Sequence, residues 1–542
     1  MKKQIVLPAL LAASLLFACE PAGSSSSEPG TGSESDASSS EVVSGSSSES
    51  ETPTPSENGN SPLRELRKSQ GRNALPSNGQ AKIAVVPVAF APEGETTFGY
   101  TTLELARLRL GHFGATAEGA QRSASEFYDA SSYGALDLGG NILDTVTLPS
   151  TLISYLQGVS TRGASEVISE IFDYVYDAVF GEGGIDPAEY DGDGDGLIDG
   201  LTLAYSFTDA TYLMNILSNS ALQNAGLQFL VDGLLDPSLI PEGVGAAYWM
   251  CGNSDPYMSL VNTAQTGQVS FVAWDFSKSY LEVAQMLGLD ALNDTIGDSA
   301  GNFRLPLGYT DLMDSGTLDH NPFSKYLLGW IEPTKVFTDS FDGEETITLA
   351  PSSEQGDAIL LAPEETGLYG EYLLIDHYEP TGNNAYDVGE GLTLMTSGAI
   401  RIYKIDARLV RGYDHFALYG GEPDYAATMV NGLGETVNYV YDFAYTNDSV
   451  NHYYSDGIAG NFPLVTILDA TGSNRHMANR LQLSSANLFQ EGDVFGEDTG
   501  IPGFYSGYRF NGNGLDGQEL GLTISVDSLT ATSASLTIRR AD

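Results

Sequence analysis

The sequence predicts a mixed α/β fold of the α+β kind, followed by a β-rich, sandwich-like C-terminal domain. Three patterns indicate this. Residues 83–90 are almost all apolar, which is typical of a strand buried on both faces of a central sheet. Apolar residues recur at helical spacing across Ala164–Phe180, so we expect a helix packed on that sheet. From about Phe341 onward, strand-like runs alternate with Gly, Asn and Asp turns.

Other segments follow the same patterns. We expect helices over residues 211–235 and 279–289 and a short strand over 201–207. Strands in the second half are expected at 346–349, 373–375, 400–405, 522–526 and 534–538. The helix over 279–289 is expected to turn inward Leu281, Ala284, Met286 or Leu287, and Leu289. A chain of 542 residues is too long for one core and indicates two or three domains.

Residues 1–18 are similar to a lipoprotein signal peptide. Lys2 and Lys3 precede an apolar run that is too short to span a bilayer as a stable helix. Cys19 follows where the bacterial lipobox has its lipidated cysteine. We therefore expect a lipid anchor at Cys19, which attaches the protein to a membrane and places it facing outward in the bacterial cell envelope, on the outer membrane or cell surface. The alternative is a plain signal peptide with an incidental cysteine.

Residues 19–74 are expected to form a disordered tether. Ser, Gly, Pro and acidic residues dominate this stretch, and no basic residue lies between Cys19 and Arg64. Such a composition buries little apolar surface and repels itself, so the chain stays extended.

The charge of the chain is strongly acidic. There are 72 Asp and Glu residues against 24 Lys and Arg, which gives a formal charge of −48. This sign excludes nucleic acid as a partner. The acidic excess fits a saline or alkaline habitat and equally fits ordinary surface solubility.

An acidic loop at residues 191–199 predicts a calcium site. Carboxylates occupy alternate positions, and Gly196 permits the sharp turn of an EF-hand-like loop. The glutamate expected at the twelfth position is replaced by Thr202, so the loop is a shortened form. The expected ligands are Asp191, Asp193, Asp195, the backbone carbonyl of Leu197, and Asp199. The alternative is an exposed acidic turn.

Residues 281–289 are similar to the active-site helix of a zinc peptidase that has lost both histidines. The motif His-Glu-x-x-His places two imidazoles on one helix face, and the Glu activates the metal-bound water. Here Leu281 and Gln285 stand at the histidine positions and Glu282 alone remains.

Several flanking motifs occur in a family-like order. They are the aromatic-rich segment 126–138, the acidic loop 190–200, the turn 311–316 and the segment 325–330, with strand-like runs at 75–90, 371–376 and 398–406. This order resembles the immune inhibitor A family of secreted bacterial zinc metallopeptidases over roughly residues 75–410. The resemblance implies a zincin-like metallopeptidase domain at 75–340 and a β-rich domain at 341–542.

The same resemblance implies that the zinc site is lost. The six histidines contain no His-x₃-His pair, Leu281 has no lone pair, and Gln285 is a poor zinc ligand. Without zinc, Glu282 has no polarised water to deprotonate, so it is a vestigial general base. We expect calcium as the cofactor and no zinc. His320 is expected in a surface loop.

The sequence therefore favours a calcium-binding pseudopeptidase that binds an extended peptide or protein, for example by adding it to a sheet edge. One alternative is an active zinc endopeptidase that recruits the metal through His320, Glu282 and Asp290. A second alternative is an adhesive or structural envelope module. The oligomeric state is left open.

Overall fold

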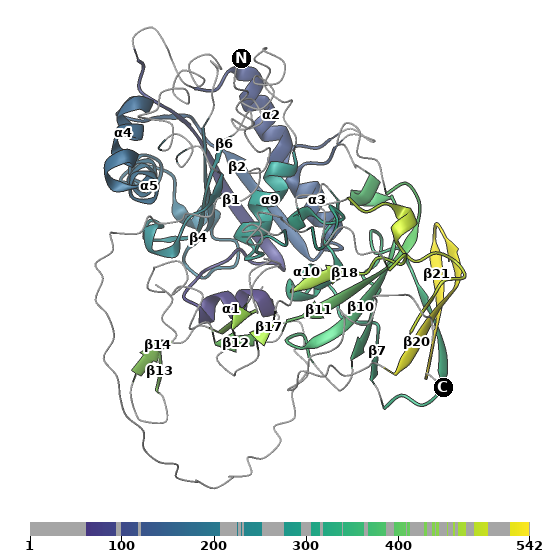
Figure 1. Cartoon of the computed structure of the whole chain (residues 1–542). Helices are drawn as coiled ribbons and strands as arrows, with labels where there is room; N and C mark the ends of the chain where they lie inside the picture. Colours follow the sequence, from purple (N-terminus) through teal and green to yellow (C-terminus); the bar gives the residue numbers. More distant parts are fainter. Residues whose placement is uncertain are drawn as a thin grey trace, which may run out of the picture.

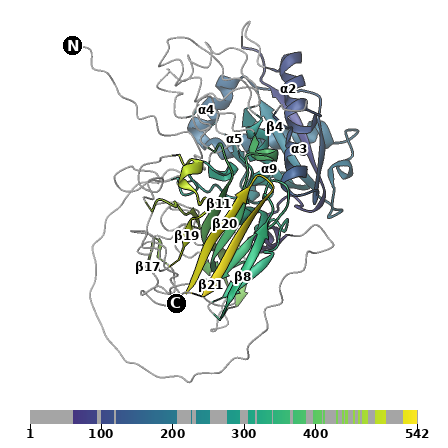
Figure 2. The same ribbon diagram turned by 90° about the vertical axis from the view of Figure 1, so that its right-hand side faces the viewer.

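The computed structural model confirms a mixed α/β fold with several separate sheets and few helices (Figures 1 and 2). It describes residues 61–93, 99–116, 121–205, 225, 229, 232–251, 276–293, 305–314, 318–338, 340–362, 367–385, 395–407, 409–411, 428–430, 436–438, 441–443, 452–453, 459–460, 464–472, 482–496 and 521–540. The predicted signal peptide, the Cys19 anchor and most of the predicted tether lie outside these residues.

The first half is built on a six-stranded sheet. Its strands are β1 (Gly79–Ala89), β2 (Leu136–Ile142), β3 (Val146–Thr147), β4 (Ile198–Tyr205), β5 (Gly233–Leu234) and β6 (Val244–Cys251). The order is β2-β1-β4-β6-β5, with β3 also paired to β1. All pairs are parallel except β5 with β6. The predicted central strand over 83–90 corresponds to β1, and the described part of the predicted short strand over 201–207 lies in β4, which is buried along its whole length.

Helices cover both faces of this sheet (Figure 1). They are α2 (Thr102–Phe113), α3 (Ala124–Ser131), α4 (Leu152–Arg162), α5 (Ala164–Phe180) and α9 (Ser277–Met286). Val86 and Val88 of β1 share a core with α4 and α5, whereas Ile83 and Val85 share another with α3 and α9. Helix α5 has the predicted bounds. Helix α9 ends before the predicted 289, because the chain turns at Gly288, whose φ of 94° suits glycine.

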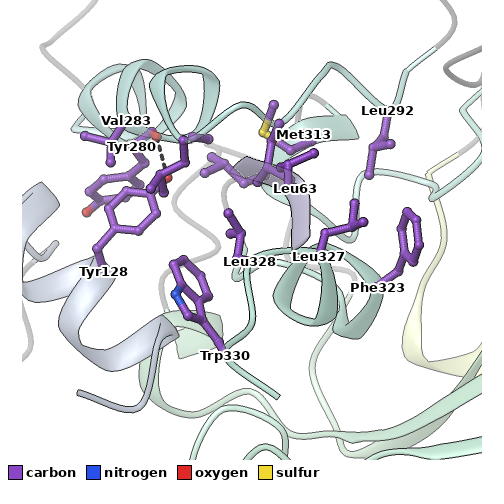
Figure 3. Packing of buried hydrophobic residues seen from close by; sticks show 14 of the residues in the cluster. Leu63, Tyr128, Tyr280, Val283, Leu292, Met313, Phe323, Leu327, Leu328 and Trp330 are labelled. Carbon is purple, nitrogen blue, oxygen red and sulfur yellow. Dashed lines mark hydrogen bonds between the residues drawn. The ribbon is translucent and has the colours of Figure 1, made fainter. Parts of the chain in front are cut away.

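A short helix at the start of the described chain corrects the predicted tether. Helix α1 (Pro62–Ser69) begins after the N-cap Ser61, whose side chain accepts a hydrogen bond from the backbone N–H of Arg64. Leu63 is fully buried among residues of α9 and of the segment 312–330 (Figure 3). Because this burial stabilises the helix, the tether boundary at residue 74 is wrong and the folded domain includes residues 61–74.

The second half contains two larger sheets. The first has the order β18-β11-β10-β9-β7 and the second β19-β20-β21-β8. Their bounds are β7 (Lys335–Thr338), β8 (Glu344–Leu349), β9 (Ile359–Ala362), β10 (Glu371–Tyr378), β11 (Ala399–Asp406), β18 (Val465–Ile467), β19 (Val494–Phe495), β20 (Leu522–Thr530) and β21 (Ser533–Arg540). One hydrophobic cluster joins them, with Ile375 and Ile402 from the first sheet and Ile524 and Ile538 from the second.

The predicted boundary at 340/341 does not separate two cores. Strand β7 lies before that boundary but pairs in parallel with β9 after it. Leu374 of β10 and Tyr403 of β11 also share a cluster with Val283 of α9. The two halves of the chain are therefore packed against each other.

The remaining elements are short. They are helix α10 (Pro322–Leu327) and the 3₁₀-helices Pro187–Tyr190, Pro237–Leu239, Leu312–Asp314, Gly382–Ala385 and Ser485–Asn487. Short paired strands are β12 (Leu409–Arg411), β13 (Thr428–Val430), β14 (Thr436–Asn438), β15 (Tyr441–Phe443), β16 (His452–Tyr453) and β17 (Ala459–Gly460). The predicted helix over 211–235 lies largely outside the described residues, and its described end is strand β5, so that end is wrong. None of the described helices has the length and apolar composition needed to cross a bilayer.

Candidate functional site

Glu282, the remnant of the zinc-peptidase motif, is fully buried in the middle of α9. Both of its carboxylate oxygens have protein partners. Oε2 lies 2.9 Å from Nε2 of His112 on α2, and Oε1 accepts a hydrogen bond from the Thr202 hydroxyl on β4. The Glu282 carboxylate therefore connects α9 to helix α2 and to strand β4.

His112 is one of the site residues that the sequence analysis did not identify. It is fully buried, and its Nδ1 lies 2.9 Å from the carbonyl oxygen of Leu108. Both ring nitrogens face oxygen atoms, and a doubly protonated ring donates a hydrogen bond to each of them. Burial alone lowers the pKa of His112, but the charge and hydrogen bond of Glu282 raise it more, so the net shift is upward. The short contact and the raised pKa of His112 together favour a buried ion pair.

Leu281 and Gln285, at the two histidine positions of the motif, are only partly buried. They lie four residues apart on one side of α9, whereas Glu282 and Val283 are completely enclosed. Leu281 was predicted to point into the core. It is instead partly buried and packs only at the edge of the hydrophobic cluster. Neither side chain provides the imidazole that zinc requires at these positions.

His320 is buried, so the prediction of a surface loop is wrong. Only 1% of it is exposed, and its ring packs against Tyr128 and Trp330, with centroids 5.8 and 6.1 Å away. Its Nε2 lies 3.3 Å from the Tyr128 hydroxyl, which donates to the Tyr280 carbonyl (Figure 3). Burial lowers the pKa of His320, which disfavours protonation of the ring.

The alternative zinc ligands do not come together. Asp290 Oδ2 lies 2.5 Å from Arg67 Nη2, Glu282 is held by His112, and His320 lies beside Tyr128. Within the described part of the chain, the one group of three candidate ligands close enough to share a metal ion is Asp191, Asp193 and Asp195. The residues at the zinc-peptidase motif thus do not fit a zinc ion.

The acidic loop brings three of its four predicted carboxylates together. Ligand oxygens of Asp191, Asp193 and Asp195 lie within 4.8 Å of one another. The Asp191 carboxylate also accepts hydrogen bonds from backbone N–H groups of Gly194, Asp195 and Gly196, at 2.7, 3.1 and 3.0 Å. These bonds hold the loop in a tight turn around its own carboxylates.

Asp199 lies outside that group. Its Oδ2 accepts hydrogen bonds from the backbone N–H groups of Lys82, at 2.8 Å, and Gly192, at 2.9 Å. Burial raises the pKa of Asp199 to about 7, against the opposing effect of these two bonds. Asp199 therefore ties the loop to β1, and the amide of Leu197 donates to Asp195 at 3.0 Å.

A buried arginine completes this region. Arg64 of α1 forms ion pairs with Asp193 and Asp195, the second at 3.4 Å, and its Nε donates to the Ala74 carbonyl at 2.9 Å. Only 3% of Arg64 is exposed. In the sequence Arg64 is the first basic residue after the acidic stretch, but no motif around it links it to the loop.

Two of the family-like motifs meet in a buried polar network. Asp319 accepts a hydrogen bond from Ser131 at 2.6 Å and pairs with Lys325 at 2.8 Å, and Lys325 also donates to Tyr133 at 2.9 Å. Burial alone lowers the pKa of Lys325 and raises that of Asp319, but their mutual attraction outweighs it and reverses both shifts. These motif residues therefore hold the fold together, away from solvent.

Comparison with known proteins gives no match for this chain, either to a protein-family model or to a curated protein. The likeness to immune inhibitor A peptidases therefore rests on the order of the motifs alone.

Proposed function

We propose that this protein is a surface-tethered, calcium-binding, metallopeptidase-like lipoprotein that binds an extended peptide or protein without cleaving it. The observation that carries the proposal is the environment of Glu282. Its carboxylate is fully buried and both oxygens are engaged, by His112 and Thr202. The proposal includes a zincin-like origin for the first half and a sandwich-like pairing of the two sheets in the second.

The chemistry of a zinc peptidase needs a carboxylate that reaches a polarised water in an open site. Glu282 instead contacts His112 in the protein interior, where bulk water does not reach its carboxylate. Leu281 and Gln285 provide no imidazole on the adjacent helix face. Through these contacts Glu282 holds α9 to α2 and β4.

The sheet supports a binding role. Strand β2 is the end strand of the described six-stranded sheet, beyond β1. An end strand presents backbone N–H and C=O groups along one side, to which an extended peptide can add as a further strand. We therefore propose an unfolded segment of another protein as the partner.

The test combines metal analysis, cleavage and binding. We expect less than one tightly bound zinc per chain and no cleavage of fluorescent casein, but saturable casein binding by fluorescence anisotropy. Stoichiometric zinc together with chelator-sensitive cleavage that is lost in Glu282→Gln would establish the active-peptidase alternative. Neither cleavage nor binding would favour the adhesive or structural envelope module.

A further inference from the structure

Helix α1 contacts two regions of the domain through two buried arginines. These regions are the acidic loop and the segment that follows α9. Arg64 faces the acidic loop at Asp193 and Asp195. Arg67, one turn later, donates to the carbonyl of Gly288 at 2.9 Å and pairs with Asp290 at 2.5 Å, beyond the C-terminal end of α9. The helix directly follows residue 60, the last residue of the stretch that we propose as the tether.

The position of Arg64 has an electrostatic consequence for the acidic loop. Three carboxylates within 4.8 Å of one another repel each other unless positive charge lies beside them. The backbone N–H groups of the loop supply part of this compensation, and the buried guanidinium supplies a full charge. The loop therefore has a counter-ion that belongs to the chain itself.

A divalent cation at this loop would need the same oxygens. Calcium takes six to eight oxygen ligands, and the Asp193 and Asp195 oxygens that face Arg64 would be among those available to it. A guanidinium and a calcium ion on the same carboxylate oxygens repel each other and compete for the same lone pairs.

We propose that Arg64 is the resident counter-ion of the acidic loop, and that calcium binding at Asp191, Asp193 and Asp195 displaces its guanidinium and loosens α1 from the domain. This inference rests on the proposed calcium site and adds its regulation. Because linkage is reciprocal, docking of Arg64 weakens calcium binding by the same factor by which calcium weakens the docking. Calcium at the loop thereby changes how the tether joins the folded domain.

Calcium titration of three variants by calorimetry tests the competition. Arg64→Gln removes the internal cation and is expected to bind calcium roughly 5- to 150-fold more tightly than the wild type, the usual range of coupling between linked sites. Arg67→Gln is the matched control, since it removes a buried arginine from the same helix that contacts Asp290 and not the loop; its calcium affinity should equal that of the wild type. Asp193→Asn should bind weakly.

Hydrogen exchange of residues 61–74 supplies a second readout on the full mature chain. In the wild type, calcium should speed exchange in this segment, whereas in Arg64→Gln exchange should already be fast without calcium. Should Arg64→Gln fail to fold, the wild-type measurement decides alone, and unchanged or slower exchange with calcium would overturn the inference. Equal calcium affinity of wild type and Arg64→Gln would overturn it as well. Absence of calcium binding in both would overturn the proposed site and this regulation together.

Discussion

At the scale of single residues, the sequence located Glu282 and the acidic loop but not their partners. His112 is separated from Glu282 by 170 residues, and Arg64 from Asp193 by 129. Neither pairing has a local signal, because a lone histidine on α2 or a lone arginine after an acidic stretch has no motif around it. Both partners follow from tertiary packing, which also explains why His320 is buried beside Tyr128.

The His112–Glu282 pair predicts a pH dependence of stability. The pKa of His112 in the folded state is raised above the ordinary 6.5 of the unfolded chain. The pair therefore contributes its full stability below about pH 6.5 and loses it as the pH rises through the folded-state pKa. In urea unfolding between about pH 6 and about pH 9, the stability of the wild type should fall relative to that of His112→Gln.

Glu282→Gln provides the control, because it removes the charge that raises the pKa of His112. Removing one partner of a buried ion pair costs about 3–5 kcal/mol, and this cost should be largest at the acidic end of the range. Parallel curves for wild type and both variants would contradict the ion-pair assignment.

At the scale of elements, periodicity predicted helices α5 and α9 and the main strands of the second half, but it missed α1, α2, α3 and α4. Helix α5 was predicted to its end residues, because its apolar residues recur over 17 positions. Helix α1 has 8 residues with Leu63 and Leu66 as its only apolar contacts with the core, and it follows a tether-like composition. A helix of this length is marginal on its own and is stabilised by packing on the rest of the fold.

Leu63 provides a test of this packing. It is fully buried between α9 and the segment that contains Leu327 and Leu328 (Figure 3). Leu63→Ala should lower the free energy of unfolding by about 2–5 kcal/mol, the usual cost of a large-to-small change in a core. The control is Leu103→Ala on α2, where the side chain is 61% exposed and the loss should stay below about 0.5 kcal/mol. Equal effects of the two changes would show that α1 does not belong to the core.

At the scale of the whole molecule, the mixed α/β class was predictable and the way its halves join was not. Composition changes near Phe341, and this change suggested separate domains. Yet Leu374 and Tyr403 beyond the change share a core with Val283 before it. Strand β10 is covered on both faces, because Leu374 belongs to one hydrophobic cluster and Ile375 to another. Its nearly continuous apolar run predicts this double burial, but it does not reveal which elements cover each face.

The calcium proposal predicts a change in the stability of the whole domain. Binding that is restricted to the folded state should add about 2.7 kcal/mol when calcium exceeds the apparent dissociation constant about 100-fold. That apparent constant already includes the displacement of Arg64. The melting temperature should therefore rise with calcium and fall back when a chelator is added, and Asp193→Ala should show neither change. A wild-type melting temperature that does not respond to calcium would contradict the site.

The proposed lipid anchor at Cys19 predicts where the whole protein is found in a cell. If Cys19 is lipidated, the wild-type protein should partition with membranes and detergent, because two or three acyl chains anchor far more firmly than one. Cys19→Ser should leave the signal peptide uncut or release a soluble product. Because Ser61 caps a helix whose Leu63 is buried, limited proteolysis should cut the anchored protein before residue 61 and release a folded fragment that keeps α1. Recovery of the wild type entirely in the soluble fraction, with Cys19 absent from its mature N-terminus, would identify a secreted protein with no lipid anchor.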